Sequence, residues 1–243
     1  MSNGSDMNNN DNKDGKLFNE VSHVIFDLDG LLIDSETIYE QIVSDIAKQY
    51  GKIYPDSTRM RILGTTEERS AEIVIEDLKL PLTMQEYLQQ YNKLCNERFN
   101  AVKLLKGAEK LIRHLNANNI PFCLATSSSQ TIVVKKTSGI PELIKMFHHI
   151  VCGSSDPEVK EGKPAPDIFL IAASRFEDKP NPEKCLVFED SPNGVKAGIE
   201  AGMQTIMVPD PRVTPEQKKL ATQFLSSLAD FRPEEFGLPK FEE

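Results

Sequence analysis

Two aspartates separated by one residue follow a short apolar run at residues 23–26. The run contains Val, Ile and Phe and has the composition of a buried strand. Because side chains at positions i and i+2 of a strand point to the same side, Asp27 and Asp29 are expected to project together where the strand ends. Two carboxylates in a buried pocket cannot both ionise without a positive partner, and a divalent cation such as Mg²⁺ prefers oxygen ligands. The spacing therefore suits a cation site.

Two other interpretations compete with a cation site of this kind. Asp29 and Gly30 by themselves are compatible with a tight turn that closes a hairpin. A calcium-binding EF-hand is excluded, because counting Asp27 as its first position puts Leu32 where the loop needs glycine and Ile38 where it needs glutamate. The remainder of the chain has to decide between a turn and a site.

The length and charge of the chain limit its class and its partners. The 243 residues are enough for one large domain or two modest ones with a sizeable core. A formal net charge of −9 argues against a nucleic-acid backbone or an anionic membrane as partner. It does not argue against a small phosphorylated substrate, because one metal ion and a few local cations can reverse the field inside a pocket.

Cysteine usage and the N-terminal segment indicate the compartment. Cys123, Cys152 and Cys185 each lie within an apolar run, and none of the four cysteines forms a C-x-x-C pair. This pattern favours buried free thiols in a reducing compartment. Residues 1–19 are polar and read as a disordered tail without the features of a signal or transit peptide. We therefore expect a cytoplasmic protein that is not inserted in a membrane.

A helical region separates the first strand from the rest of the chain. Apolar residues repeat every four positions after Asp34 or Ser35, either of which can cap a helix. Thr83 and Glu86 have the spacing of a capping box. Residues 37–101 contain several helix patterns and no strand pattern, so we interpret them as an all-helical insertion.

Strand and helix patterns then alternate. Apolar strands separated by helices predict an α/β fold with a parallel sheet covered on both faces. Ligands of such sheets bind at the carboxyl ends of the strands. The predicted strands after the insertion are 121–125, 150–152, 185–188 and 205–208.

Polar residues follow these strands and add to the aspartate pair. Thr126 and Ser127 end one strand, Glu189 and Asp190 end another, and Lys163 lies in a loop before a helix. Taken singly, the hydroxyl and acidic residues could be helix caps and the lysine a surface residue. All of them on one edge of the sheet would suit phosphoryl transfer through an aspartyl phosphate, in which Mg²⁺, hydroxyls and a lysine hold the phosphoryl oxygens.

The order and content of these motifs resemble the phosphatases of the haloacid dehalogenase (HAD) superfamily. The resemblance covers nearly everything after the tail and is greatest for the pseudouridine-5'-phosphatase and glycerol-phosphatase branch. It implies a Rossmann-like parallel-sheet core at 20–36 and 102–243, with 37–101 as an all-helical cap. The segments that carry it include VIFDLDGLLIDSE (24–36), PFCLATSSS (121–129), DPEVKEGKPAPDIFL (156–170) and CLVFEDSPNGVKAG (185–198).

The resemblance also implies roles for the acidic and basic residues. Asp27 would be the nucleophile and Asp29 the general acid and base. The carboxylates of Asp27 and Asp190 and the backbone carbonyl of Asp29 would hold Mg²⁺, with Glu189 supporting them. Lys163 would neutralise charge on the phosphoryl group.

Other residues would bind the substrate. By the same resemblance, Thr126 and Ser127 would bind phosphate, and the segment 59–69 around Gly64 would be the specificity loop of the cap. Of its three arginines, we expect at least two to lie on a solvated helix face.

The resulting expectation is a Mg²⁺-dependent phosphomonoesterase that is a monomer or weak dimer. Pseudouridine 5'-phosphate is the first choice of substrate and glycerol phosphate the second. A phosphomutase of the β-phosphoglucomutase type shares the same core motifs. A binding protein without activity on the same fold is disfavoured by the intact motif residues.

Overall fold

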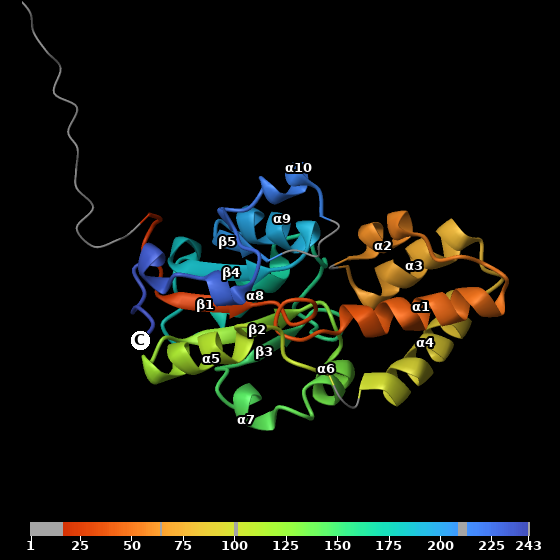
Figure 1. The fold of residues 1–243 in the computed structure, drawn as a ribbon, viewed down its shortest axis with the longest axis horizontal. Coiled ribbons are helices and arrows are strands. Elements are labelled where there is room, and N and C mark those ends of the chain that lie inside the picture. Colours follow the sequence, from red (N-terminus) through yellow and green to blue (C-terminus); the bar gives the residue numbers. More distant parts are fainter. Residues whose placement is uncertain (1–16, 64, 100–101, 209–212, 243) are drawn as a thin grey trace, which may run out of the picture.

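The computed structural model describes residues 17–63, 65–99, 102–208 and 213–242. Its centre is a six-stranded sheet in the order β3-β2-β1-β4-β5-β6, in which every neighbouring pair is parallel (Figure 1). The predicted parallel sheet is confirmed. Strand β6 was not predicted, because two residues are too short to show a pattern. The strands are β1 (His23–Phe26), β2 (Phe122–Thr126), β3 (Ile150–Cys152), β4 (Cys185–Glu189), β5 (Gln204–Met207) and β6 (Gln223–Phe224).

Strand β1 lies in the middle of the sheet and is buried on both faces. Phe26 belongs to one apolar cluster and stacks on Phe188 at 5.1 Å, whereas Ile25 belongs to a second cluster on the other face. Phe26 is in register with Leu124 of β2 and Phe188 of β4. The chain therefore leaves β1 at Asp27 between the ends of two buried strands.

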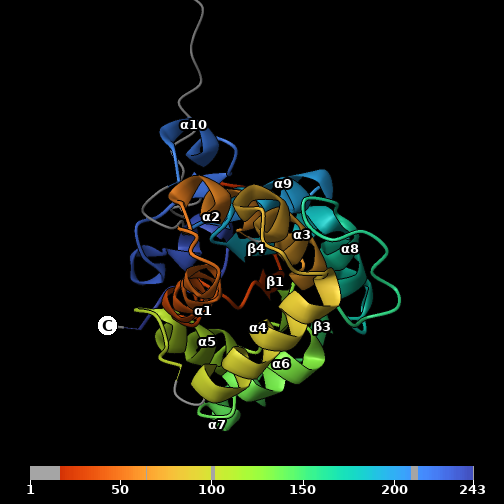
Figure 2. The same ribbon diagram turned by 90° about the vertical axis from the view of Figure 1, so that its right-hand side faces the viewer.

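Helices cover both faces of the sheet, as predicted. Apolar residues of α5 share the cluster of Phe26, and apolar residues of α8 and α9 share the cluster of Ile25 (Figures 1 and 2). The helices of this part are α5 (Ala108–Ala117), α6 (Gln130–Lys136), α7 (Pro141–Ile144), α8 (Asp167–Ser174), α9 (Pro192–Glu200) and α10 (Pro215–Lys218).

The helices between β1 and α5 form a separate group, which we call the inserted helices. They have their own apolar cluster, which includes Ile46, Val74 and Tyr87, and they lie beyond the carboxyl ends of the strands (Figure 1). The capping box of Thr83 and Glu86 is confirmed. The inserted helices are α1 (Glu36–Gln49), α2 (Asp56–Ile62), α3 (Glu67–Leu78) and α4 (Met84–Arg98).

The N-terminal boundary of the folded part differs from the prediction. Residues 1–16 lie outside the described residues, but the backbone N–H groups of Leu17 and Phe18 donate to the carbonyl of Glu235, and Phe18 stacks on Phe236 at 4.5 Å. Residues 17–19 therefore belong with the core and not with the predicted tail, because an aromatic ring anchors them. The four cysteines are buried and free, as predicted for three of them. None of the described helices has the length and apolar character needed to span a bilayer.

Candidate active site

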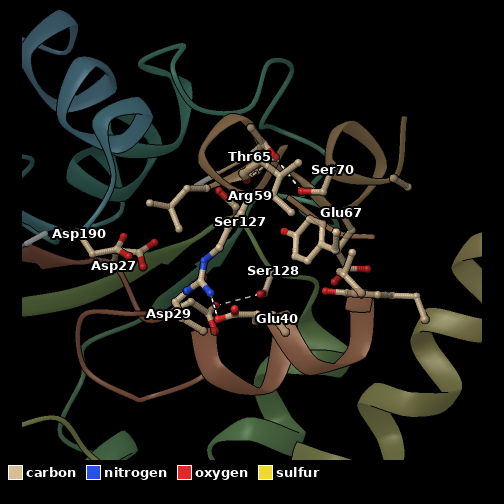
Figure 3. A pocket seen from close by; sticks show the side chains of 18 of the residues that line it. Asp27, Asp29, Glu40, Arg59, Thr65, Glu67, Ser70, Ser127, Ser128 and Asp190 are labelled. Atoms are coloured by element: carbon tan, nitrogen blue, oxygen red, sulfur yellow. Dashed lines mark hydrogen bonds and ion pairs between the residues drawn. The ribbon is translucent and has the colours of Figure 1, made fainter. Parts of the chain in front are cut away.

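Parallel strands bring the predicted site residues to one edge of the sheet. Asp27 directly follows β1, Thr126 is the last residue of β2, and Glu189 ends β4. Lys163 comes from the loop before α8, and its side chain reaches across the end of β2 to the end of β1. Figure 3 shows Asp27 and Asp190 next to each other at one side of the site.

Lys163 contacts two of these carboxylates. Its ammonium nitrogen donates to Asp27 Oδ1 at 2.6 Å and to the carbonyl of Ala125 at 3.0 Å, and it lies 2.6 Å from Glu189 Oε1. The side chain is almost completely buried. Burial by itself lowers the pKa of Lys163, but the carboxylates of Asp27 and Glu189 outweigh this effect, so the pKa lies above its ordinary value. Lys163 is therefore a fixed positive charge.

The negative charges of the acidic residues outnumber the single positive charge of Lys163. Oxygen atoms of Asp27, Glu189 and Asp190 lie within 4.8 Å of one another, and all three residues are buried. Burial raises the pKa of Asp27 to about 7 and that of Asp190 well above its ordinary value, even though Lys163 lowers both. Among the described residues, the Asp190 carboxylate has no hydrogen-bond or ion-pair partner. The donor set and its formal charge of −2 with Lys163 fit a divalent cation.

Glu189 is held by its own neighbours. Its Oε2 accepts hydrogen bonds from the backbone N–H of Asp190 at 3.1 Å and from both the N–H and the hydroxyl of Ser191, at 3.3 and 3.1 Å. A Cβ atom at Gly194 would lie 1.9 Å from this carboxylate, so only glycine fits beside it. These contacts orient the turn that carries Asp190, which suits a supporting role for Glu189.

Asp29 has a different set of partners. Its Oδ1 accepts from the Ser35 hydroxyl and the Lys136 ammonium, both at 2.5 Å, and its Oδ2 accepts from Ser128 at 3.0 Å and Thr126 at 3.3 Å. Burial raises the pKa of Asp29, but Lys136 and these hydroxyls outweigh that effect, so the pKa lies below its ordinary value. The two aspartates of the motif thus bind two different lysines and have opposite pKa shifts.

Lys136 is the main residue that the sequence analysis missed. It lies at the end of α6 on the same buried face as Ile132 and Val133. A lysine at i+3 and i+4 from two apolar residues was the available signal, because such a position is rarely charged without a partner. Ser35 was predicted as a possible helix cap; it stands at the N-cap of α1, but its hydroxyl makes no cap hydrogen bond and donates to Asp29.

Replacing Lys136 by methionine should destabilise the protein strongly. The side chain is completely buried, and its loss would leave Asp29 as a buried carboxylate without a cation. Breaking such a pair costs about 3–5 kcal/mol of the free energy of unfolding. Denaturant unfolding checks this, with Lys135→Met on the same helix as control, because the Lys135 ammonium donates to the side chain of the exposed Asn96 and not to a buried carboxylate. Adding Asp29→Asn should recover part of the loss, and a fully additive double variant would contradict the pairing.

Of the remaining predicted residues, one lines a cavity at this edge of the sheet. Ser127 lines it, and its backbone carbonyl accepts a hydrogen bond from Ser154 at 2.7 Å. Thr126 is buried, with its hydroxyl directed to Asp29. Gly64 lies outside the described residues. The core side of the cavity is lined by Asp27, Asp29, Ser127, Ser128 and Asp190.

The inserted helices supply the other side of the cavity. Arg59 of α2 is only 4% exposed, lines the cavity and forms an ion pair with Glu40 of α1 (Figure 3). Arg61 and Arg69 are exposed and pair with acidic residues of α3, so the expectation that at least two of the three arginines are solvated is confirmed. The lining residues from the inserted helices and their loops include Tyr39, Tyr54, Thr65, Glu67, Ser70, Tyr87 and Tyr91.

Gly30 is required where the chain turns away from the site. Its φ is +72°, and a Cβ atom there would lie 2.2 Å from Asp190 Oδ2. We expect Gly30→Ala to lower the free energy of unfolding by more than about 2 kcal/mol and the catalytic rate at least about tenfold, because both the backbone and Asp190 must shift.

Gly51→Ala is the matched control for this substitution. Its φ is +67°, but no atom of the residues that the structure describes lies within 4 Å of the added methyl group. It should lower the free energy of unfolding by only about 1 kcal/mol and leave activity unchanged. Equal effects of the two substitutions, measured by denaturant unfolding and by phosphate release, would show that the contact with Asp190 is unimportant.

The sequence and the fold identify the family. Residues 24–208 match the family model of the haloacid dehalogenase-like hydrolases, and the chain belongs to this family. The fold agrees: a β-phosphoglucomutase structure from Clostridium difficile superposes with a TM-score of 0.72, covering 87% of this chain and 93% of that chain at 23% identity.

The curated relatives narrow the enzyme class. The chain is 50% identical to the "Probable pseudouridine-5'-phosphatase" of Drosophila melanogaster, over 93% of this chain and 98% of that protein. It is 42% identical to (DL)-glycerol-3-phosphatase 2 of Arabidopsis thaliana, over 92% of this chain and 94% of that protein. Both relatives are phosphatases, and the chain is an enzyme of the phosphoric monoester hydrolase class.

Proposed function

We propose that the chain is a Mg²⁺-dependent phosphatase that hydrolyses a small phosphorylated metabolite through an aspartyl phosphate on Asp27, with pseudouridine 5'-phosphate as the preferred substrate. The observation that carries the mechanism is the unequal environment of the two aspartates. Asp27 lies with Lys163, Glu189 and Asp190, whereas Asp29 lies with Lys136 and three hydroxyl groups. Asp27 is thus the carboxylate that lies beside the positive charge of Lys163 and the proposed cation site, where a nucleophile for phosphorus is needed.

Asp27 is the proposed nucleophile. Its carboxylate attacks phosphorus, the bond from phosphorus to the leaving oxygen breaks, and the phosphoryl group is transferred to Asp27. Lys163, only 2.6 Å from Asp27, balances the negative charge of the phosphoryl oxygens. Thr126 and Ser127 are proposed to bind the same oxygens through hydroxyl and backbone N–H groups. A bound divalent cation, held by Asp27, Asp190 and the Asp29 carbonyl, would supply further neutralisation of this charge.

Asp29 is the proposed general acid and base. In the first step it gives a proton to the leaving oxygen, and in the second it takes a proton from the water that attacks the aspartyl phosphate. Because Lys136 and the hydroxyls lower the pKa of Asp29, this role requires Asp29 to be protonated when the substrate is bound. The protein returns to its starting state with free phosphate as product. The inserted helices, which we propose as the cap at 37–101, close the cavity over this centre and exclude bulk water.

The preferred substrate is inferred from the relatives. Identity is higher to the protein named as a pseudouridine-5'-phosphatase than to the one named as a glycerol-3-phosphatase. Phosphate release should be screened over nucleoside, sugar and polyol monophosphates with Mg²⁺, using Asp27→Asn as the inactive control. Preferential turnover of glycerol phosphate would replace the first choice by the second. Stable conversion of glucose 1-phosphate to glucose 6-phosphate without free phosphate would show a mutase.

Binding of Mg²⁺ should release protons. The raised pKa values of Asp27, about 7, and of Asp190 mean that the cation-free site holds protons which the cation must displace. The apparent Kd for Mg²⁺ should therefore increase at least about tenfold between about pH 7.5 and pH 5.5. Titration calorimetry in two buffers of different ionisation enthalpy measures the released protons. An affinity that does not change with pH would contradict the raised pKa values.

A further inference from the structure

The cavity has two chemically different ends. Asp27 and Asp190 lie at one side of Figure 3, whereas Glu67 and Ser70 of α3 lie at the other. The first end holds the phosphoryl-transfer residues. The second end has no part in the proposed phosphoryl transfer, although it lies between the inserted helices and the core.

Tyrosines form a continuous aromatic wall at the second end, which we call the tyrosine wall: Tyr39, Tyr87 and Tyr91. The rings of Tyr39 and Tyr91 are parallel within 5°, and those of Tyr87 and Tyr91 within 17°, with 6.0 Å between the centroids in both pairs. All three side chains line the cavity. Burial raises the pKa of each phenol well above its ordinary value, so the wall is uncharged.

Neighbouring side chains hold the tyrosine wall in place. Tyr39 also packs against Phe99 at 5.0 Å and lies 4.4 Å from the ammonium of Lys136, and Tyr87 is almost completely buried. A rigid aromatic surface loses little entropy when a flat ring stacks on it, and stacking of a base on an aromatic side chain is worth about 1–3 kcal/mol. Glycerol phosphate has no group that could use this surface.

Polar groups border the wall at its edge. Glu67 lines the same cavity as Tyr39 and Tyr91, and its Oε1 accepts from the N–H and the hydroxyl of Ser129 at 3.4 and 3.3 Å. The hydroxyls of Ser70 and Thr65 are 2.7 Å apart beside it. A flat apolar surface with acceptors and hydroxyls at its margin suits a heterocycle whose edge carries N–H and carbonyl groups.

We propose that the tyrosine wall is the subsite for a heterocyclic ring, which makes nucleoside-type monophosphates the substrate class of the enzyme. The inference rests on the proposed function, since the ring must be attached to the phosphate that Asp27 attacks. The wall acts on substrate selection, and the phosphoryl-transfer residues are the same for every substrate. The contribution of the tyrosine wall is therefore measured by the ratio of kcat/KM between substrates with and without a ring.

Pseudouridine 5'-phosphate and ribose 5-phosphate are the matched substrates, because ribose 5-phosphate carries a hydroxyl group where pseudouridine 5'-phosphate carries the ring. For the wild type we expect kcat/KM to be about 5- to 150-fold higher with the ring, which is the stacking energy expressed as a rate ratio. Tyr91→Leu, which keeps an apolar side chain, should reduce this ratio to within about threefold of unity while changing turnover of ribose 5-phosphate less than about threefold. Tyr91→Phe keeps the ring and should retain the preference.

The outcomes separate the inference from the function on which it rests. An equal loss for both substrates in Tyr91→Leu, or a wild type without preference for the ring, would overturn the tyrosine wall as subsite while phosphatase activity stands. Activity of Asp27→Asn equal to the wild type would overturn the proposed mechanism instead. If Tyr91→Leu does not fold, Tyr87→Leu gives the same comparison, and an unchanged ratio in that variant would also overturn the inference.

Discussion

Asp27→Asn is expected to abolish phosphate release. Asparagine has the size of aspartate but cannot form the acyl phosphate, so the reaction loses its nucleophile. Loss of a residue that forms the covalent intermediate lowers kcat by about 10⁴-fold or more. Phosphate release in the presence of Mg²⁺ measures the effect. Mass spectrometry of acid-quenched wild type, incubated with substrate, should place the phosphoryl group on the peptide that contains Asp27.

The variant should remain folded. Lys163 keeps its contact with Glu189 at 2.6 Å, so removal of one carboxylate does not leave the lysine unpaired. The cation-free variant should have a Tm no lower than the wild type, because one of the three crowded carboxylates is gone. Asp34→Asn is the control: Asp34 is exposed and its carboxylate accepts only from the Thr37 hydroxyl among the contacts described. Activity of Asp27→Asn within tenfold of the wild type would refute the role of Asp27 as the nucleophile.

Removal of divalent cations is expected to have the second largest effect. Chelation leaves Asp27, Glu189 and Asp190 with Lys163 as their cation. Burial raises the pKa of Asp27 to about 7 in the cation-free site, so part of the proposed nucleophile is protonated at neutral pH. Activity should fall below detection after treatment with EDTA and return when Mg²⁺ is added in excess. Turnover that survives chelation would refute the role of the metal.

Cation binding should also be visible without any substrate. A ligand present at about 100 times its Kd stabilises the folded state by about 2.7 kcal/mol, which raises Tm by about 5–10 °C in a chain of this size. Asp190→Asn removes the carboxylate that has no partner among the described residues, and its Tm should respond much less to Mg²⁺. The same Tm shift in the variant and the wild type would place the cation elsewhere.

Local sequence patterns were sufficient to predict the α/β class. The run at 23–26 and the later apolar strands are each short and bounded by turns. Because these strands alternate with helices, the pattern predicts a parallel sheet. Because every parallel strand ends at the same edge, the positions of Thr126, Glu189 and Asp190 beside Asp27 followed from their order in the chain. The short strand β6 and the contact of Phe18 with Phe236 were missed, because neither has a local pattern.

Only the tertiary structure distinguished the two aspartates. Strand alternation placed Asp27 and Asp29 on one side, and both line the cavity, but β1 ends at Phe26 and the backbone beyond it turns at Gly30. Their partners then come from distant segments: Lys163 from the loop before α8 and Lys136 from the end of α6. The types and order of the proposed catalytic residues can thus be read from the sequence. Which lysine binds each aspartate depends on packing between segments more than 100 residues apart, and no local spacing in the sequence predicts this pairing.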